Sequence, residues 1–173
     1  MAGTNYWQTA GFYNEAVNVD SAMKRLEVHL KQVPVLFKEF TEEQLLQKPA
    51  PGKWSKKEIL GHLIDSAINN LERFTEVQFL PQPYHIVSYK QDELVAINHY
   101  QELPINHLLD LWSALNKQIV YVVQSTPGQS FEFPVDPKYD NGEMKTLGWV
   151  ICDYLAHMEH HLKQVTAKPD TNS

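Results

Sequence analysis

Four stretches of the chain repeat apolar residues every three or four positions, which is the spacing of one face of an α-helix. Prolines and glycines separate these stretches. Because no segment predicts a sheet as clearly, the apolar faces have to be buried helix against helix. The sequence therefore predicts an all-α fold, a four-helix bundle that forms a single domain over residues 1–173 with a helical core from about 20 to 167.

The first helix is expected to begin near Asp20, a good helix starter, and to contain Pro34, at which a proline can kink a helix. The second is expected to begin at Ser55. Glu58 follows three residues later and completes the reciprocal capping pattern of a helix start. Pro81 is expected to lie beyond the end of this helix.

The third helical region is expected over about 92–125, with an interruption near Pro104. Residues 126–144 contain three prolines and two glycines and predict a long loop before the last helix. Alternating apolar residues favour a short hairpin within that loop: Phe131, Phe133 and Val135. The last helix is expected to start at Thr146 and to reach about residue 167.

Charge and cysteine content exclude several classes of protein. The formal net charge is -6, whereas a non-specific nucleic-acid binder needs a basic stripe. We see no basic amphipathic segment for a membrane surface and no run of roughly 18 apolar residues. Met1 to Gln8 shows no signal-peptide pattern, and the single cysteine, Cys152, fits a reducing compartment. We therefore expect a cytoplasmic protein without nucleic-acid or membrane partners.

His157 and His161 are four residues apart in the last predicted helix, so their side chains leave one face one turn apart. This spacing lets two imidazoles reach one metal ion. At about 100° per residue, both lie at the edge of the apolar stripe, whereas His160 falls on the polar side and is not counted as a ligand. The alternative is chance, because the chain has eight histidines.

Three known motifs do not fit this pair. A zincin has glutamate directly after the first histidine, where this chain has Met158. The inverted motif requires glutamate where His160 stands. His157 and Glu159 mimic the start of a nucleobase-deaminase motif, but that site also needs two cysteines.

His62, in the second helix, is a third candidate ligand. It begins a polar row on almost the same line of the helix: Ser66, Asn69 and Arg73, with Asn70 beside them. Such a row can line a groove between helices, or it can be a solvated face, which the pattern alone slightly favours. The remaining histidines have no partner at ligand spacing and are expected at the surface or in loops: His29, His85, His99 and His107.

Two segments resemble the DinB/YfiT-like superfamily. One is Trp54-Ser55 followed by His62-Leu63-Ile64-Asp65-Ser66. The other is Trp149 followed by Asp153-Tyr154-Leu155-Ala156-His157-Met158-Glu159-His160-His161-Leu162. The order of the helices and the long third connection agree with this family from about residue 20 to 167.

The resemblance implies a four-helix bundle, often a homodimer, in which three histidines on two helices surround one divalent metal. The motif histidines fall on His62, His157 and His161. Some relatives are thiol-dependent S-transferases that use bacillithiol or mycothiol, and others are labelled metal-dependent hydrolases. The resemblance therefore implies a small-molecule substrate and, for the transferase reading, a low-molecular-weight thiol as a second cofactor.

Three neutral imidazoles leave an open position on a four-coordinate metal, for which zinc or nickel is expected. Such a metal can lower the pKa of bound water to about 7 or hold a deprotonated thiol. Hydrolysis and thiol transfer both remain open, with transfer narrowly ahead. A structural or non-catalytic metal site is the competing class, although Cys152, about 140° round the helix from His157, is a poor fourth ligand.

Two aspartates stand about one turn from the predicted ligands, Asp65 after His62 and Asp153 before His157. Each could accept a hydrogen bond from a ligand imidazole or serve as a general base, or could be an exposed surface carboxylate. The substrate-binding candidates are the residues of the polar row: Ser66, Asn69, Asn70 and Arg73. Arg73 could pair with a carboxylate of the substrate or the thiol cofactor.

Overall fold

The structure is a computed structural model that describes residues 17–137 and 143–167. The segment Met1 to Gln8, in which we expect no signal peptide, lies outside the described residues. The long helices of the described chain are α1 (Val19–Lys38), α3 (Lys56–Glu76), α5 (Ile105–Ser125) and α6 (Leu147–Thr166). Two short helices, α2 (Glu42–Leu46) and α4 (Gln91–Ile97), lie in the connections, as do the 3₁₀ helices η2 (Tyr100–Glu102) and η3 (Gly128–Glu132).

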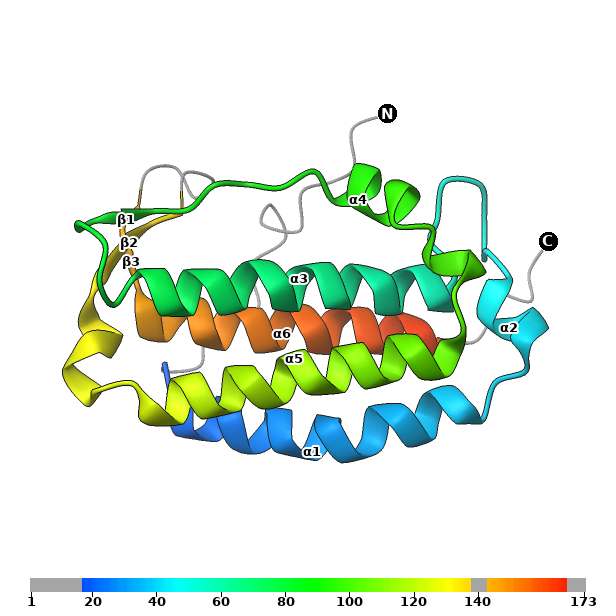
Figure 1. The fold of residues 1–173 in the computed structure, drawn as a ribbon, viewed down its shortest axis with the longest axis horizontal. Helices are drawn as coiled ribbons and strands as arrows, with labels where there is room; N and C mark the ends of the chain where they lie inside the picture. The colour runs from blue at the N-terminus through cyan, green and yellow to red at the C-terminus, as the bar shows by residue number, and fades with distance from the viewer. Residues whose placement is uncertain (1–16, 138–142, 168–173) are drawn as a thin grey trace.

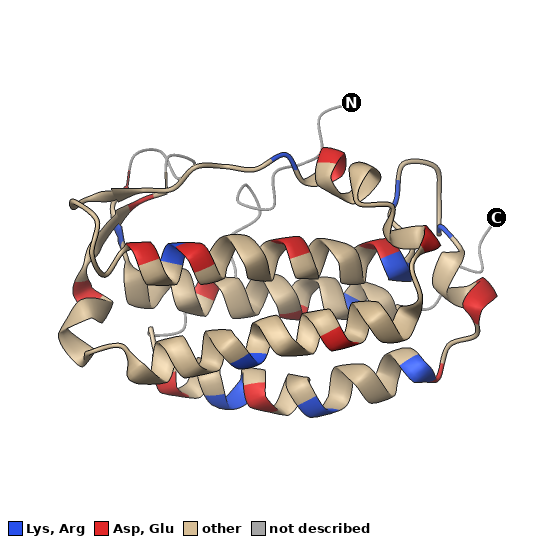
Figure 2. Ribbon diagram, in the orientation of Figure 1, with Lys and Arg blue, Asp and Glu red and all other residues tan. Residues whose placement is uncertain are grey.

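The four long helices lie side by side as a bundle (Figure 1). Helices α1 and α3 each pack against both α5 and α6, so α1 and α3 occupy opposite corners. Their inward faces form one core, which includes Leu26, Leu60, Trp112, Ile119 and Met158. The predicted four-helix bundle is therefore confirmed. Acidic and basic residues both occur along each of the long helices (Figure 2), and no helix in the described ranges is long and apolar enough to cross a bilayer.

The predicted helix starts are close to the observed ones. Ser55 caps α3, and the Ser55 hydroxyl and the Glu58 carboxylate each accept the other residue's backbone N–H, as the capping pattern predicts. Thr146 caps α6 by accepting the N–H of Trp149. Helix α1 is capped by Asn18 and begins at Val19, one residue before Asp20, and it continues through Pro34. The short helix α2 was not predicted.

The region before the last helix agrees with the prediction only in part: an antiparallel strand pair is present, but of the three alternating residues only Val135 belongs to it. Phe131 lies in η3 and Phe133 is the residue that caps its end, so they do not form a hairpin strand. Only Val135 lies in a strand, β2 (Pro134–Asp136). Strand β2 pairs antiparallel with β3 (Lys145–Thr146). It also pairs parallel with β1 (Tyr84–His85), which follows α3 much earlier in the chain. A small three-stranded sheet therefore closes one end of the bundle (Figure 1).

Residues 86–90, which we call the strap, connect β1 to α4 along the outside of α3 (Figure 1). Beyond α4, the chain returns to α3 through η2. Gly61 makes this return possible, because a Cβ on Gly61 would lie 2.1 Å from Cδ2 of Tyr100. The Tyr100 ring can thus lie directly on the backbone of α3. The strap contacts the polar row of α3 where the backbone oxygen of Val87 accepts from Arg73, and η2 contacts the same helix where Tyr100 donates to Asp65.

Candidate metal centre

Three histidine side chains meet in the groove between α3 and α6. His62 extends from α3, and His157 and His161 extend from successive turns of α6. Their ring centroids are 4.6 to 4.9 Å apart, and one ligand atom from each lies within 4.8 Å of the others. All three are buried; His62 has an exposed fraction of 0%. The slightly favoured prediction of a solvated face around His62 was therefore wrong.

Burial keeps these imidazoles neutral. It lowers the pKa of His62 to about 3 and that of His161 to about 4; the hydrogen bond with Gln164 partly opposes the effect on His161, and a neighbouring histidine adds a smaller lowering at each. The pKa of His157 lies well below its ordinary value, first because of burial and then because of the charges of His62 and His161. A neutral imidazole keeps a lone pair for a metal, so all three side chains are in the ligand form at neutral pH.

The donor atoms fit a divalent transition metal. Nε2 of His62 and Nε2 of His157 are 3.1 Å apart. Nitrogen ligands at about 2.1 Å from a tetrahedral metal are separated by roughly 3.4 Å, so little movement is needed to accept an ion. In the described part of the chain, these three histidines are the complete set of side chains placed to bind one metal ion. Three protein ligands leave one tetrahedral position on that ion for another molecule.

Nδ1 of His161 is hydrogen-bonded to Gln164, a residue that was not among the candidates predicted from the sequence. Nδ1 of His161 lies 3.0 Å from Oε1 of Gln164, and Nε2 of Gln164 lies 3.0 Å from Nε2 of His160. Because a carbonyl oxygen can only accept, this contact places the proton of His161 on Nδ1 and the lone pair on Nε2. The spacing of three residues along α6 is a signal that could have found Gln164.

The two aspartates are buried, so the alternative of exposed surface carboxylates was wrong for both. Oδ1 of Asp65 accepts hydrogen bonds from the Tyr100 hydroxyl at 2.6 Å and from Nδ2 of Asn98 at 3.0 Å. Asp65 thus fastens η2 to α3, and burial raises the pKa of its carboxyl despite these two bonds. Nδ1 of His62 has no hydrogen-bond partner among the described residues, so Asp65 does not hold this ligand here.

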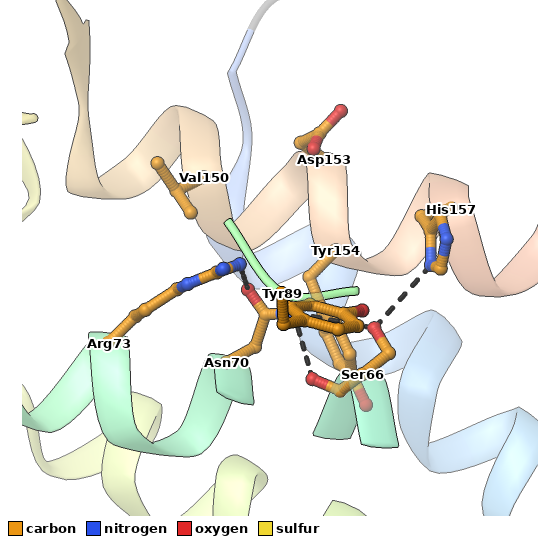
Figure 3. Close-up of a pocket in the computed structure, with 8 residues that line it drawn as sticks. All are labelled: Ser66, Asn70, Arg73, Tyr89, Val150, Asp153, Tyr154 and His157. Atoms are coloured by element: carbon orange, nitrogen blue, oxygen red, sulfur yellow. Dashed lines mark hydrogen bonds between the residues drawn. The ribbon is translucent and has the colours of Figure 1, made fainter. Parts of the chain in front are cut away.

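A small cavity opens beside His157, with a volume of about 10 Å³, which is room for roughly one water molecule. Its walls come from α3, α6 and the strap (Figure 3): Ser66, Asn70, Arg73, Tyr89, Val150, Asp153, Tyr154 and His157. The cavity therefore contains three of the four predicted substrate-binding residues. Asn69 is not among them; its amide donates to the backbone oxygen of Asp65 on its own helix.

The polar lining of this cavity is connected by hydrogen bonds (Figure 3). Oγ of Ser66 lies 3.5 Å from Nδ1 of His157. Nδ2 of Asn70 donates to the backbone oxygen of Ser66 at 2.9 Å, and Nη1 of Arg73 is 3.4 Å from Oδ1 of Asn70. Polar groups thus continue from the histidines to Arg73.

Tyr89 closes the cavity from the strap side, where its ring lies between α3 and α6 (Figure 3). Burial raises the pKa of Tyr89, and a hydrogen bond with Ser66 partly opposes that effect. The guanidinium carbon of Arg73 is 5.7 Å from the centroid of the Tyr89 ring. Tyr89 could not be predicted from the sequence, because it stands outside any periodic helix and no spacing rule relates it to the histidines.

The other histidines take no part in this group. His85, His99 and His107 are exposed, as predicted. His29 is only half-buried in α1, and its Nε2 lies 3.1 Å from a carboxylate oxygen of Glu159 on α6. The expectation of a surface or loop position was therefore incomplete for His29, because an i,i+4 pattern cannot reveal a partner on another helix.

Comparison with known proteins identifies relatives of this chain. The sequence profile of the DinB superfamily matches residues 25–165. Proteins of Bacillus cereus (strain AH820) and Bacillus anthracis (strain A0248), each proposed in its name to be a metal-dependent hydrolase, are 24% identical to the chain over 149 residues. The aligned region covers 86% of this chain and 84% of each relative.

A solved structure has the same fold. It is YfiT from Bacillus subtilis, described as a probable metal-dependent hydrolase with an unusual four-helix bundle topology. The TM-score is 0.78 at 20% sequence identity, over 88% of this chain and 86% of YfiT. At this identity, the comparison shows the fold and leaves the chemistry to the residues of the site.

Proposed function

This chain belongs to the DinB superfamily, and from that premise we propose that it is a metal-dependent hydrolase of a small molecule. The observation that carries the proposal is the group of three buried, neutral histidines beside a polar cavity. The names of the relatives support the same reaction class. Because the histidines extend from two packed helices, the ligand positions are rigid.

We expect one divalent metal per chain, zinc or nickel, bound by His62, His157 and His161. Three imidazole nitrogens suit these borderline ions better than calcium or magnesium, which prefer oxygen. When bound, such a metal supplies Lewis acidity, which polarises a carbonyl group and lowers the pKa of water to about 7.

The other cavity residues have distinct tasks in this proposal. Asp153 is the candidate general base, since it is among the residues that line the cavity beside His157. Ser66 and Asn70 offer hydrogen-bonding groups to the substrate. Tyr89 covers the cavity and keeps bulk water from the reacting groups.

The test combines metal analysis with a substrate panel. Purified protein loaded with zinc or nickel is assayed against small esters and amides, and its metal content is measured by elemental analysis. We expect His157→Ala to lose both stoichiometric metal and turnover. His107→Ala changes an exposed histidine on α5 and should keep both. Turnover that survives in His157→Ala, or full metal retention in the triple alanine variant of the three histidines, would refute the proposal.

Thiol transfer is the second candidate. It is favoured by the small number of possible general bases in the cavity wall, because hydrolysis needs a base. Asp65 is hydrogen-bonded to Tyr100 and Asn98 and is not part of the cavity wall, so Asp153 is the sole carboxylate among the described lining residues. A metal-held thiolate needs no general base. Asp153→Asn should therefore reduce hydrolysis by about 10²-fold or more but leave conjugation of a low-molecular-weight thiol intact. The sequence alone ranks thiol transfer narrowly ahead of hydrolysis. We reverse that order because the relatives are named as metal-dependent hydrolases.

We also propose that the chain is a homodimer. The family resemblance and the aromatic content of four Trp, eight Tyr and seven Phe support this, since aromatic residues are enriched at interface centres. Light scattering at micromolar concentration should give about twice the chain mass. A particle of 20.0 kDa would exclude the dimer.

A further inference from the structure

Arg73 is a buried cation at the far end of the cavity from the histidines. Its side chain is 6% exposed and extends from α3 into the space beside α6 (Figure 3). Nη2 donates to the backbone oxygen of Val87 in the strap at 3.0 Å, and Nη1 is 3.4 Å from Oδ1 of Asn70. A guanidinium group has five N–H donors, so most of its donors are not used by these two contacts.

No carboxylate of the described residues forms an ion pair with this guanidinium. The neighbouring acidic groups are engaged or exposed: Oε2 of Glu76 accepts the Tyr84 hydroxyl, and Glu72 faces solvent. Asp153 belongs to the same cavity wall but does not reach Arg73 within ion-pair distance. Burying a charge without a counter-charge is costly, so proteins usually pair such a group.

We propose that Arg73 binds a carboxylate of the substrate, so that the enzyme cleaves esters or amides that carry a carboxylate several bonds from the cleaved bond. This proposal rests on the proposed hydrolase function and names its substrate class. The carboxylate supplies the missing counter-charge, and a guanidinium pairs with it through two parallel hydrogen bonds. Hydrolysis joins the water oxygen to the acyl carbon and breaks its bond to the leaving oxygen or nitrogen, which departs with a proton.

A carboxylate fits this position better than a phosphate group. Arg73 is the only cationic side chain among the described residues of the cavity wall, and Asp153 adds a negative charge to the same wall. A phosphate monoester carries up to two negative charges and needs further donors or cations. A single negative charge on a flat group matches the single guanidinium.

The distance along α3 between Ser66 and Arg73 sets how far the carboxylate of the substrate lies from the cleaved bond. Ser66, which is close to His157, and Arg73 are seven positions apart on α3, or about 10 Å along the helix axis at 1.5 Å per residue. Arg73 reaches back towards Asn70, which shortens this span. A substrate with its carboxylate directly beside the cleaved bond is too short to contact both Arg73 and the histidine end.

Binding is tested first, because it needs no turnover. We propose to measure the affinity of the zinc-loaded protein for succinate, glutarate and adipate by calorimetry, with their diamides and inorganic phosphate as comparison ligands. The wild-type protein should bind a dicarboxylate, and Arg73→Gln should weaken this binding by at least about 10-fold. Equal binding of the diamides, stronger binding of phosphate, or undiminished binding in Arg73→Gln would overturn the proposal.

Two further variants control for charge and folding. Lys117→Gln removes one positive charge from an exposed position on α5 and should bind like the wild-type protein. Arg73→Lys keeps the charge but not the two-pronged geometry and should bind with intermediate affinity. Thermal melts identify any variant that fails to fold. If Arg73→Gln unfolds, wild-type affinity in Arg73→Lys would count against the bidentate pairing.

Hydrolysis assays distinguish the role of Arg73 from the proposed hydrolase function itself. Half-esters of dicarboxylic acids with one to six methylene groups are compared with the corresponding dimethyl esters. We expect an optimum chain length for the half-esters, and Arg73→Gln should raise KM and remove that optimum. If no ester or amide is hydrolysed, the proposed function fails while the binding result still stands. Hydrolysis without preference for the half-esters would refute the role of Arg73 alone.

Discussion

At the scale of single residues, Gln164 sets the tautomer of His161. Replacing Gln164 with alanine removes the acceptor of the Nδ1 proton, so the lone pair is no longer confined to Nε2. We expect Gln164→Ala to weaken metal affinity by roughly 10-fold. The check is a competition titration with a chromophoric chelator.

The control for this prediction is Gln124→Ala, since Gln124 is exposed and donates to Glu27 on the surface. Its metal affinity should equal that of the wild-type protein. Unchanged affinity in Gln164→Ala would mean that the helix alone orients His161.

The residues of the site could be predicted from the sequence better than their contacts. The spacing of His157 and His161 and the polar row beginning at His62 were visible, because a helix repeats regularly. The partners of Asp65 could not be predicted, since Tyr100 and Asn98 reach it only after the chain has turned back over α3. A spacing rule has no information about such contacts between segments distant in sequence.

At the scale of secondary-structure elements, the approach of η2 to α3 depends on Gly61. A methyl group at this position would overlap the Tyr100 ring, which would have to move away from Asp65. We expect Gly61→Ala to lower the free energy of unfolding by about 1–3 kcal/mol, despite the better helix propensity of alanine. Urea unfolding measures this change.

Gly128→Ala is the matched control, because a Cβ at Gly128 meets no atom within 4 Å. Its free energy of unfolding should stay within about 0.5 kcal/mol of the wild-type value. A Gly61→Ala protein as stable as this control would show that η2 can shift without loss.

The helices were more predictable than the small sheet for a physical reason. A helix start such as Ser55 with Glu58 is encoded within four neighbouring residues. The strands β1, β2 and β3 are two or three residues long, and Val135 finds its partner at Tyr84 only through the folded bundle. Strands this short lack an alternation long enough to recognise.

At the scale of the whole molecule, the buried histidines make the stability of the metal-free protein depend on pH. Burial lowers the pKa of His62 to about 3 and of His161 to about 4, whereas in the unfolded chain both are near 6.5. Between these values, the unfolded state binds more protons, so the free energy of unfolding falls as the pH falls. Each histidine contributes at most about 1.4 kcal/mol per pH unit.

Urea unfolding in the presence of a chelator, at pH values from 7.5 to 5, measures this dependence. His157→Gln has one titratable group fewer in the cluster and should show a shallower slope. A free energy of unfolding that does not change over this range would contradict the prediction.

The strap also has a kinetic consequence for the whole molecule. With Tyr89 in place, the cavity of about 10 Å³ is too small for an organic molecule, so the proposed function requires the strap to move before a substrate enters. Association then proceeds at the pace of a conformational change, and its observed rate reaches a plateau as substrate concentration rises. In stopped-flow measurements, Tyr89→Ala should raise or abolish that plateau, at the cost of faster escape of the bound molecule.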